Sequence, residues 1–212
     1  MELGFLGGEA LEEQITHAWA LGECAEEFLT GPANFLDLGS GGGLPGLVLA
    51  SRWQGWKGLL LDSNLRRTTF LTRAVEACGW TGRVGVLRSR AESAARTTLR
   101  GGFDLVVARS FASPPVTAEC AAGFLRVGGI LVVSEPPPDS SGPLPPDSER
   151  PDPVRWPTAG LEKLGLEPLA LWRRSFGFQV LRQVVDCPDR FPRREGIPAK
   201  RPIYPVRASR VN

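Results

Sequence analysis

The sequence predicts an α/β fold: a doubly wound, mostly parallel sheet with a C-terminal antiparallel strand. Five β-α units alternate between residues 34 and 135, where each short apolar run precedes a stretch with helical spacing. The apolar runs contain few polar residues, which is typical of parallel strands covered on both faces. Near the C-terminus, two strand-like runs are joined only through Ser175-Phe176-Gly177, which predicts an antiparallel hairpin.

The chain begins with a predicted helix over residues 9–29. Ile15, Ala18 and Trp19 recur at spacings of three and four with other apolar residues, which predicts one buried stripe. The Gly31-Pro32 pair ends this helix. His17, the only histidine, lies before the fold proper, and we expect it to pack on the helix or face solvent.

The alternating elements then follow in order. Strands are predicted at residues 34–38, 57–62, 83–89, 103–109 and 127–135. Helices are predicted at residues 44–53, 65–78, 91–97, 114–125 and 158–165. Ser63-Asn64 offers an N-cap to one of these helices, and Pro114-Pro115 suits the first turn of another. The final hairpin strands are predicted at residues 166–174 and 176–187.

Two segments differ in composition from the rest. Residues 136–157 contain nine prolines, which predicts a Pro-rich loop. Residues 190–212 contain seven basic residues and one acidic residue, which makes this a basic C-terminal segment. We expect a helical extension at 1–30 and a single domain at 31–212 that includes both segments.

Composition excludes several classes of protein. Hydrophobic residues make up 42% of the 212 and charged residues 23%, which is typical of a globular chain. No apolar run approaches the ~20 residues that a membrane-spanning helix needs. The acidic N-terminus lacks the basic start of a signal peptide, and the four cysteines are too widely spaced for a metal cluster. We expect a cytoplasmic monomer with reduced cysteines, no membrane partner and no metal.

The stretch FLDLGSGGGLPGLVLA (35–50) carries the strongest functional signal. It places a glycine-rich turn between a strand and a helix, where α/β proteins bind nucleotides. Asp37-x-Gly39-x-Gly41-x-Gly43 matches the D/E-x-G-x-G-x-G loop of class I S-adenosylmethionine-dependent methyltransferases. The pattern calls for an acidic residue at the end of the second strand to bind ribose, and Asp62 is in that place.

A second pattern overlaps the first and leaves an alternative open. Gly41-x-Gly43-x-x-Gly46 matches the dinucleotide fingerprint, so a nicotinamide-dinucleotide oxidoreductase remains a competing interpretation. The acidic residue two positions before Gly39 favours the methyl donor. The fourth strand ends with ARSFA (108–112) and lacks the [DN]-P-P-[YF] of amino-group methyltransferases. Arg109 is therefore our candidate for a cation that faces the ligand crevice and binds a phosphate or a base edge.

Several motifs together resemble the bacterial RsmG (GidB) family, whose members methylate guanosine N7 in 16S ribosomal RNA. They are the glycine loop, LLDSNLRRTTFL, RSRAE (88–92), FDLVVARSFAS and the C-terminal RREGIPAKRP (193–202). The resemblance covers residues 35–125 and 177–203. It implies a class I methyltransferase (Rossmann-like) fold, S-adenosyl-L-methionine as cofactor, and 16S rRNA in the 30S subunit as partner.

The resemblance also implies roles for individual residues. The residues implied in cofactor binding are Asp37, Gly39, Ser40, Gly41, Gly43, Leu44, Asp62, Ser63, Ala91, Glu92 and Arg109. Arg109 is implied to lie between cofactor and RNA as the catalytic residue. The residues implied in RNA binding are Arg193, Arg194, Lys200 and Arg201.

One departure from the family pattern supports a different function for this chain. Family members usually carry a lysine-glycine pair after the fifth strand, where this chain has Ser134-Glu135. Replacing a cation by an anion is expected to weaken phosphate binding there. The alternative is therefore a methyltransferase of the same lineage with another substrate, or a protein that binds S-adenosylmethionine or S-adenosylhomocysteine with little catalysis.

Overall fold

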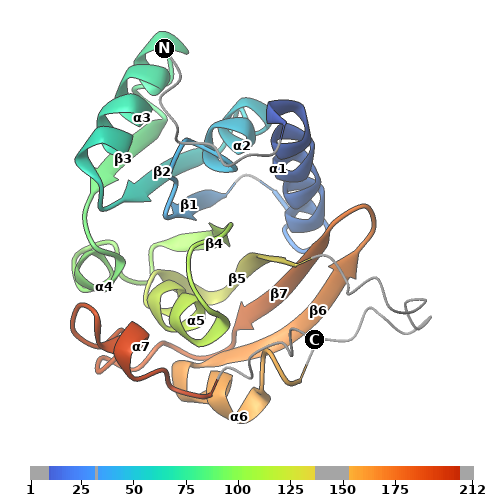
Figure 1. The fold of residues 1–212 in the computed structure, drawn as a ribbon, viewed down its shortest axis with the longest axis vertical. Coiled ribbons are helices and arrows are strands. Elements are labelled where there is room, and N and C mark those ends of the chain that lie inside the picture. Colours follow the sequence, from blue (N-terminus) through green and yellow to red (C-terminus); the bar gives the residue numbers. More distant parts are fainter. Residues whose placement is uncertain (1–9, 32, 137–152, 206–212) are drawn as a thin grey trace.

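The computed structural model describes residues 10–31, 33–136 and 153–205, and its core is a single twisted sheet (Figure 1). Seven strands lie in the order β3-β2-β1-β4-β5-β7-β6. They are β1 (Asn34–Leu38), β2 (Lys57–Asp62), β3 (Val84–Arg88), β4 (Phe103–Ala108), β5 (Leu125–Glu135), β6 (Leu166–Arg173) and β7 (Gly177–Gln183). Strands β1 to β5 are parallel, and β7 runs antiparallel to both of its neighbours.

Helices cover both faces of this sheet (Figure 1). They are α1 (Leu11–Glu26), α2 (Gly46–Arg52), α3 (Leu65–Ala77), α4 (Ala91–Ala94), α5 (Pro114–Ala122), α6 (Thr158–Leu161), the 3-10 turn η1 (Glu162–Leu164) and α7 (Ile197–Lys200). Alternate strand residues face opposite layers, as the pleat requires. Phe35 of β1 packs with α1, α2 and α3, whereas Leu36 packs with α4, α5 and α6. The predicted fold class, a doubly wound, mostly parallel sheet with a C-terminal antiparallel strand, is confirmed.

Most predicted elements are present close to their expected bounds. The N-cap before α3 is confirmed, because Asn64 Oδ1 accepts from the N–H groups of Arg66 at 2.9 Å and Arg67 at 3.2 Å. Sequence analysis did not predict α7. Residues 137–152, which make up most of the predicted Pro-rich loop, lie outside the described residues. The division at residue 30 stays a prediction, although α1 shares a core with α2 and β1.

The prediction for the buried face of α1 was partly wrong. Ile15 is 41% exposed and Trp19 is 44% exposed, whereas Ala18, Leu21 and Ala25 are fully buried. Gly22 lets the helix lie close to α2, because a Cβ at this position would be 3.0 Å from Cδ2 of Leu49.

The strand order reverses between β1 and β4, which lie side by side at the centre of the sheet. Ligands of open α/β sheets bind at such a point, outside the carboxyl ends of the strands. Gly39, Asp62, Arg109 and Glu135 end or directly follow four neighbouring strands at this edge. Among the described residues, no helix is long and apolar enough to cross a membrane.

Candidate functional site

The turn after β1 requires glycine at two positions for different reasons. Gly39 has φ +78°, and a Cβ there would lie 2.6 Å from Cδ2 of Phe111, so the Phe111 ring lies directly against the backbone. At Gly46, a Cβ would collide with Oδ2 of Asp37 and the side chain of Leu60. The second glycine therefore lets the Asp37 carboxylate reach the first turn of α2.

Asp37 is 1% exposed and stabilises the turn from the protein interior. Its Oδ2 accepts from the Gly46 N–H at 2.9 Å, and its backbone carbonyl accepts from the Ser40 hydroxyl at 3.0 Å. Burial raises the pKa of the Asp37 carboxyl to about 7, because the charged form loses solvation. Asp37 and Ser40 therefore shape the loop from inside the protein.

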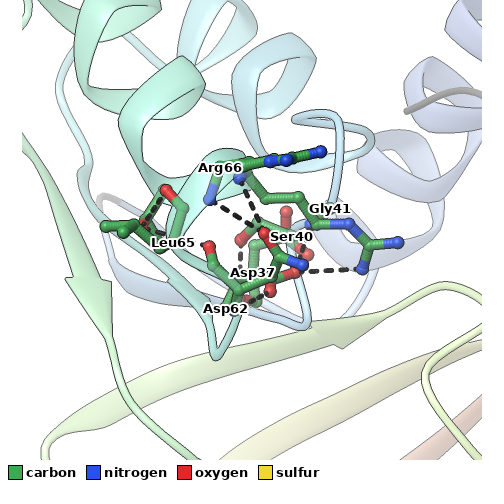
Figure 2. Close-up of polar contacts among 9 residues, drawn as sticks. Asp37, Ser40, Gly41, Asp62, Leu65 and Arg66 are labelled. Carbon is green, nitrogen blue, oxygen red and sulfur yellow. Dashed lines mark hydrogen bonds and ion pairs between the residues drawn. The ribbon is translucent and has the colours of Figure 1, made fainter. Parts of the chain in front are cut away.

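Asp62 at the end of β2 is the acidic group that faces the loop (Figure 2). Its Oδ2 accepts from the Gly41 N–H at 2.9 Å, and its Oδ1 accepts from the Asn64 N–H at 2.8 Å. Arg67 forms an ion pair with it at 3.5 Å. A carboxylate offers about four lone-pair positions, so Asp62 keeps acceptor capacity for further donors.

A cavity of about 350 Å³ lies beside Asp62, and we call it the loop pocket. Five residues predicted to bind cofactor line it: Gly39, Asp62, Ser63, Ala91 and Glu92. Its other walls include apolar side chains such as Leu61, Phe111 and Val116. The remaining predicted cofactor residues are not part of its lining, namely Asp37, Ser40, Gly41, Gly43, Leu44 and Arg109.

A second cavity, of about 440 Å³, lies on the other side of the segment that follows β4. We call it the arginine pocket, because four arginines line it: Arg109, Arg155, Arg173 and Arg174. His17 of α1 also lines it, and burial together with the nearby Arg109 charge lowers the pKa of His17 to about 4. The imidazole is therefore neutral at physiological pH. Ser110, Phe111 and Ala112 line both pockets and form their shared wall.

The expectation that Glu135 weakens phosphate binding stays a prediction, but the structure pairs this carboxylate with a cation. Its Oε2 accepts from Nε of Arg155 at 2.6 Å, and its Oε1 accepts from Nε1 of Trp156 at 2.7 Å. The ion pair supplies a cation from 20 residues further along the chain. The lining residues of the arginine pocket, which include two glutamates (Glu13 and Glu135), carry a formal charge of +2 when His17 is neutral. One of the four arginines, Arg174, is ion-paired at 2.7 Å to Glu27, which is not part of the lining.

The predicted RNA-binding residues divide into one anchored side chain and three exposed ones. The Arg193 guanidinium donates to Glu119 at 2.9 and 2.6 Å, and also to the Arg201 carbonyl at 2.7 Å. Glu119 lies on α5 and is 0% exposed. Arg193 therefore positions the basic segment, whereas Arg194, Lys200 and Arg201 are exposed at its surface.

The basic segment is also attached to the loop pocket. Oε1 of Glu92, a pocket residue, accepts from the Gly196 N–H at 3.0 Å, and Ser93 donates to Glu195. Ala199 of α7 is part of the pocket lining. The exposed cations of this segment thus lie beside the pocket that Asp62 faces.

Sequence analysis missed most of the arginine pocket. Arg155 and Trp156 lie within the segment 136–157, which sequence analysis treated only as a loop, and His17 was expected to pack on the helix or face solvent. It does pack against Phe176 and Phe178, with ring centroids 4.8 and 5.1 Å away, but it lines the pocket as well. Within residues 10–31, 33–136 and 153–205, no group of three or more His, Cys, Asp or Glu residues could hold a metal ion.

Solved structures share this fold at low sequence identity. The [4+2]-cyclase SpnF has a TM-score of 0.55 at 20% identity, covering 77% of this chain and 61% of SpnF. Coclaurine N-methyltransferase bound to N-methylheliamine and SAH has a TM-score of 0.50 at 14% identity, covering 64% and 42% of the two chains. One of these is a cyclase and the other a methyltransferase, so the fold alone does not specify the reaction.

Sequence comparison is more specific. The family model described as rRNA small subunit methyltransferase G (GidB) matches residues 8–135. Ribosomal RNA small subunit methyltransferase G of Syntrophomonas wolfei is 33% identical over 174 residues, covering 79% of this chain and 76% of that protein. The Moorella thermoacetica protein of the same name is 34% identical over 179 residues, covering 81% and 70%. The chain belongs to the GidB family of rRNA small subunit methyltransferase G proteins.

Proposed function

We propose that this protein transfers a methyl group from S-adenosyl-L-methionine to N7 of a guanosine in 16S rRNA of the small ribosomal subunit. One observation carries the proposal: five residues predicted for the cofactor line a single pocket at the centre of the sheet edge. Membership of the GidB family supports ribosomal RNA as the substrate class.

The loop pocket suits the proposed cofactor chemically. Ribose hydroxyls are hydrogen-bond donors, and Asp62 presents a carboxylate with remaining acceptor capacity. Leu61, Val116 and Phe111 offer apolar surface for an adenine ring. When bound, S-adenosylmethionine supplies an electrophilic methyl group on a sulfonium.

The proposed reaction needs positioning more than proton transfer. Guanine N7 has a lone pair and no proton to remove, so no general base is required. Alignment, exclusion of water and electrostatic tuning are what the protein must supply. We propose that Arg109, which follows β4 and lies next to the shared wall, holds the RNA in place through a phosphate or a base edge.

The exposed basic segment is the proposed contact with ribosomal RNA. Arg194, Lys200 and Arg201 are exposed, and Ala199 between them lines the loop pocket. Phosphate contacts of this kind fix the register of an RNA and make binding dependent on salt.

The decisive experiment incubates the protein with 30S subunits from a strain that lacks this methylation, together with labelled S-adenosylmethionine. We expect one modified base, which primer extension and mass spectrometry should map to a 7-methylguanosine in 16S rRNA. Arg109→Ala should reduce transfer more than it reduces affinity for S-adenosylhomocysteine. Label in any other base, or no label at all, contradicts the proposal.

The alternatives are distinguished by binding. Tight binding of S-adenosylhomocysteine without transfer to any RNA favours a binding protein or another substrate. A thermal shift with NAD but none with S-adenosylhomocysteine favours the oxidoreductase interpretation of Gly41, Gly43 and Gly46.

A further inference from the structure

The outward face of α1 carries a row of exposed apolar side chains, which we call the α1 stripe. Leu11 is 53% exposed, Ile15 41% and Trp19 44%. Residues four apart lie one turn apart on the same face of a helix, so the three side chains are neighbours. The helix lies at the outside of the molecule beside α2 (Figure 1). Single exposed hydrophobic residues are common, but a contiguous group on one face indicates an interaction site.

Trp19 is held in its outward position by α2. Cζ of Arg52 lies 4.3 Å from the centroid of the Trp19 ring. Arg52 is itself fixed, because its Nε and one terminal nitrogen each donate to a carboxylate oxygen of Glu26 at 2.7 Å. The indole therefore loses little conformational freedom when a partner covers it. Preorganised aromatic side chains of this kind are frequent hot spots of protein interfaces.

The charges around the α1 stripe favour one kind of partner. Residues 11–27 include five glutamates and no lysine or arginine. Glu12 lies three residues before Ile15, and Glu23 lies four residues after Trp19, so both border the stripe. Phosphates of RNA or of anionic lipids would be repelled here, and α1 of a second copy would bring like charges together. A basic polypeptide with an apolar side chain complements both the charge and the surface.

The α1 stripe also lies near the edge of the sheet that carries the candidate site. His17, between Ile15 and Trp19 in the sequence, lines the arginine pocket at that edge. A helix is about 10–12 Å across with its side chains, so the stripe lies within about that distance of the pocket. A particle as large as a ribosomal subunit that binds at this edge therefore comes close to the stripe. Proteins that coat rRNA are rich in lysine and arginine, because they neutralise its phosphates.

We propose that the α1 stripe docks a basic ribosomal protein of the small subunit. The stripe packs on an aliphatic or aromatic side chain of that protein, and Glu12 and Glu23 pair with its lysines or arginines. The basic segment packs with α5 on one layer of the sheet, whereas α1 belongs to the other layer. The assembled subunit is thus recognised through RNA on one side and through protein on the other. This assignment rests on the proposed function.

Photo-cross-linking identifies what covers the stripe. Trp19 is replaced by p-benzoylphenylalanine, and the full chain, saturated with S-adenosylhomocysteine, is irradiated with purified 30S subunits. We expect a cross-link to a lysine- and arginine-rich ribosomal protein, identified by mass spectrometry. Cross-links only to rRNA, only to a second copy of this chain, or to nothing overturn the assignment. The same photoreactive residue at Val127, which is 46% exposed at the opposite edge of the sheet, is the control and should not give this product.

Binding affinities separate a protein contact from an RNA contact. Trp19→Ala should weaken binding to 30S subunits by about tenfold, as expected for an interface hot spot, and leave binding to protein-free 16S rRNA unchanged. Equal weakening on both would overturn the assignment. Val127→Ala is the matched control for loss of an exposed apolar side chain, and it should bind like wild type. Affinity for S-adenosylhomocysteine should be the same in all three proteins, because the stripe does not line the loop pocket.

A charge reversal gives a result whose sign depends on the partner. Glu12→Lys should weaken binding to 30S subunits several-fold, because it repels a basic protein. If RNA covers the stripe, the same variant gains a phosphate contact and binds more tightly. Unchanged or tighter binding therefore overturns the assignment.

The outcomes separate the two proposals. If the stripe cross-links to a ribosomal protein and Trp19→Ala weakens subunit binding, but no base is methylated, the proposed function fails and the docking surface stands. If 30S subunits are methylated while Trp19→Ala and Glu12→Lys leave subunit affinity unchanged, the docking surface is overturned and the proposed function stands.

Discussion

Replacing Arg193 tests whether this arginine binds RNA or holds the basic segment in place. Arg193→Ala removes two side-chain hydrogen bonds to Glu119, at 2.9 and 2.6 Å, and one to the Arg201 carbonyl at 2.7 Å. The Arg193 backbone N–H, which donates to Glu119 at 2.8 Å, remains in the alanine variant. In the variant, the fully buried Glu119 carboxylate therefore keeps one hydrogen-bond donor, the uncharged backbone N–H of residue 193.

The expected cost follows from this environment. Removing one partner of a buried ion pair costs about 3–5 kcal/mol, because the other charge stays buried and unpaired. The Arg193 side chain is 28% exposed, so water can partly replace it, and we expect about 3 kcal/mol. That is a large share of the roughly 5–15 kcal/mol that stabilises most domains. For a chain of this length the melting temperature should fall by about 6–12 °C.

The assay compares two adjacent arginines. Urea unfolding followed by circular dichroism should show the loss for Arg193→Ala, whereas Arg194→Ala should stay within about 0.5 kcal/mol of wild type. When equal concentrations of folded protein are compared, Arg194→Ala should weaken binding to 30S subunits more than Arg193→Ala does. Arg194→Ala should also reduce the salt dependence of log K by roughly 0.7–0.9, the effect of one phosphate contact. Equal unfolding free energies for the two variants would refute the anchoring role of Arg193.

Three further predictions concern the loop. Asp62→Ala should weaken binding of S-adenosylhomocysteine by about tenfold in calorimetry, since it removes the proposed ribose acceptor, and an unchanged Kd would contradict that role. Gly39→Ala should lower the unfolding free energy in urea more than Gly79→Ala does. Both glycines have φ near +70 to +80°, but only at Gly39 would a Cβ collide with Phe111. Equal losses for the two variants would show that the Phe111 ring moves freely. Asp37 has a pKa raised to about 7, so its stabilising contribution is full below the unfolded-state pKa near 3.8 and is lost as pH rises through 7. As pH rises across that window, the unfolding free energy of Asp37→Asn should therefore increase relative to that of wild type by up to about 1.4 kcal/mol per pH unit. The measurement is unfolding free energy against pH for both proteins, and parallel curves would exclude the buried carboxyl as the cause.

The loop pocket could be anticipated from sequence because local pattern and topology agree there. A strand, a glycine turn and a second strand ending in Asp62 bring the same atoms together in any parallel sheet of this order. The arginine pocket could not be anticipated in this way. His17, Arg109 and Arg155 come from three distant segments, and only packing places them around one cavity.

Neighbouring residues in the basic segment show the same limit of prediction from sequence. Arg193 and Arg194 are equivalent in the sequence, yet only one of them meets a buried carboxylate, which lies 74 residues earlier. Composition identifies the cations. Which of them remain available to a partner depends on the surface against which the segment packs.

The attachment of the basic segment is largely a matter of main-chain atoms. Glu92 binds the Gly196 N–H, and Arg96 and Arg100 donate to the carbonyls of Pro192 and Phe191. These contacts do not depend on which side chains the segment carries at its exposed positions. The exposed side chains can therefore be exchanged while the backbone stays docked, so a library at positions 194, 200 and 201 could alter RNA preference without rebuilding the pocket beside it.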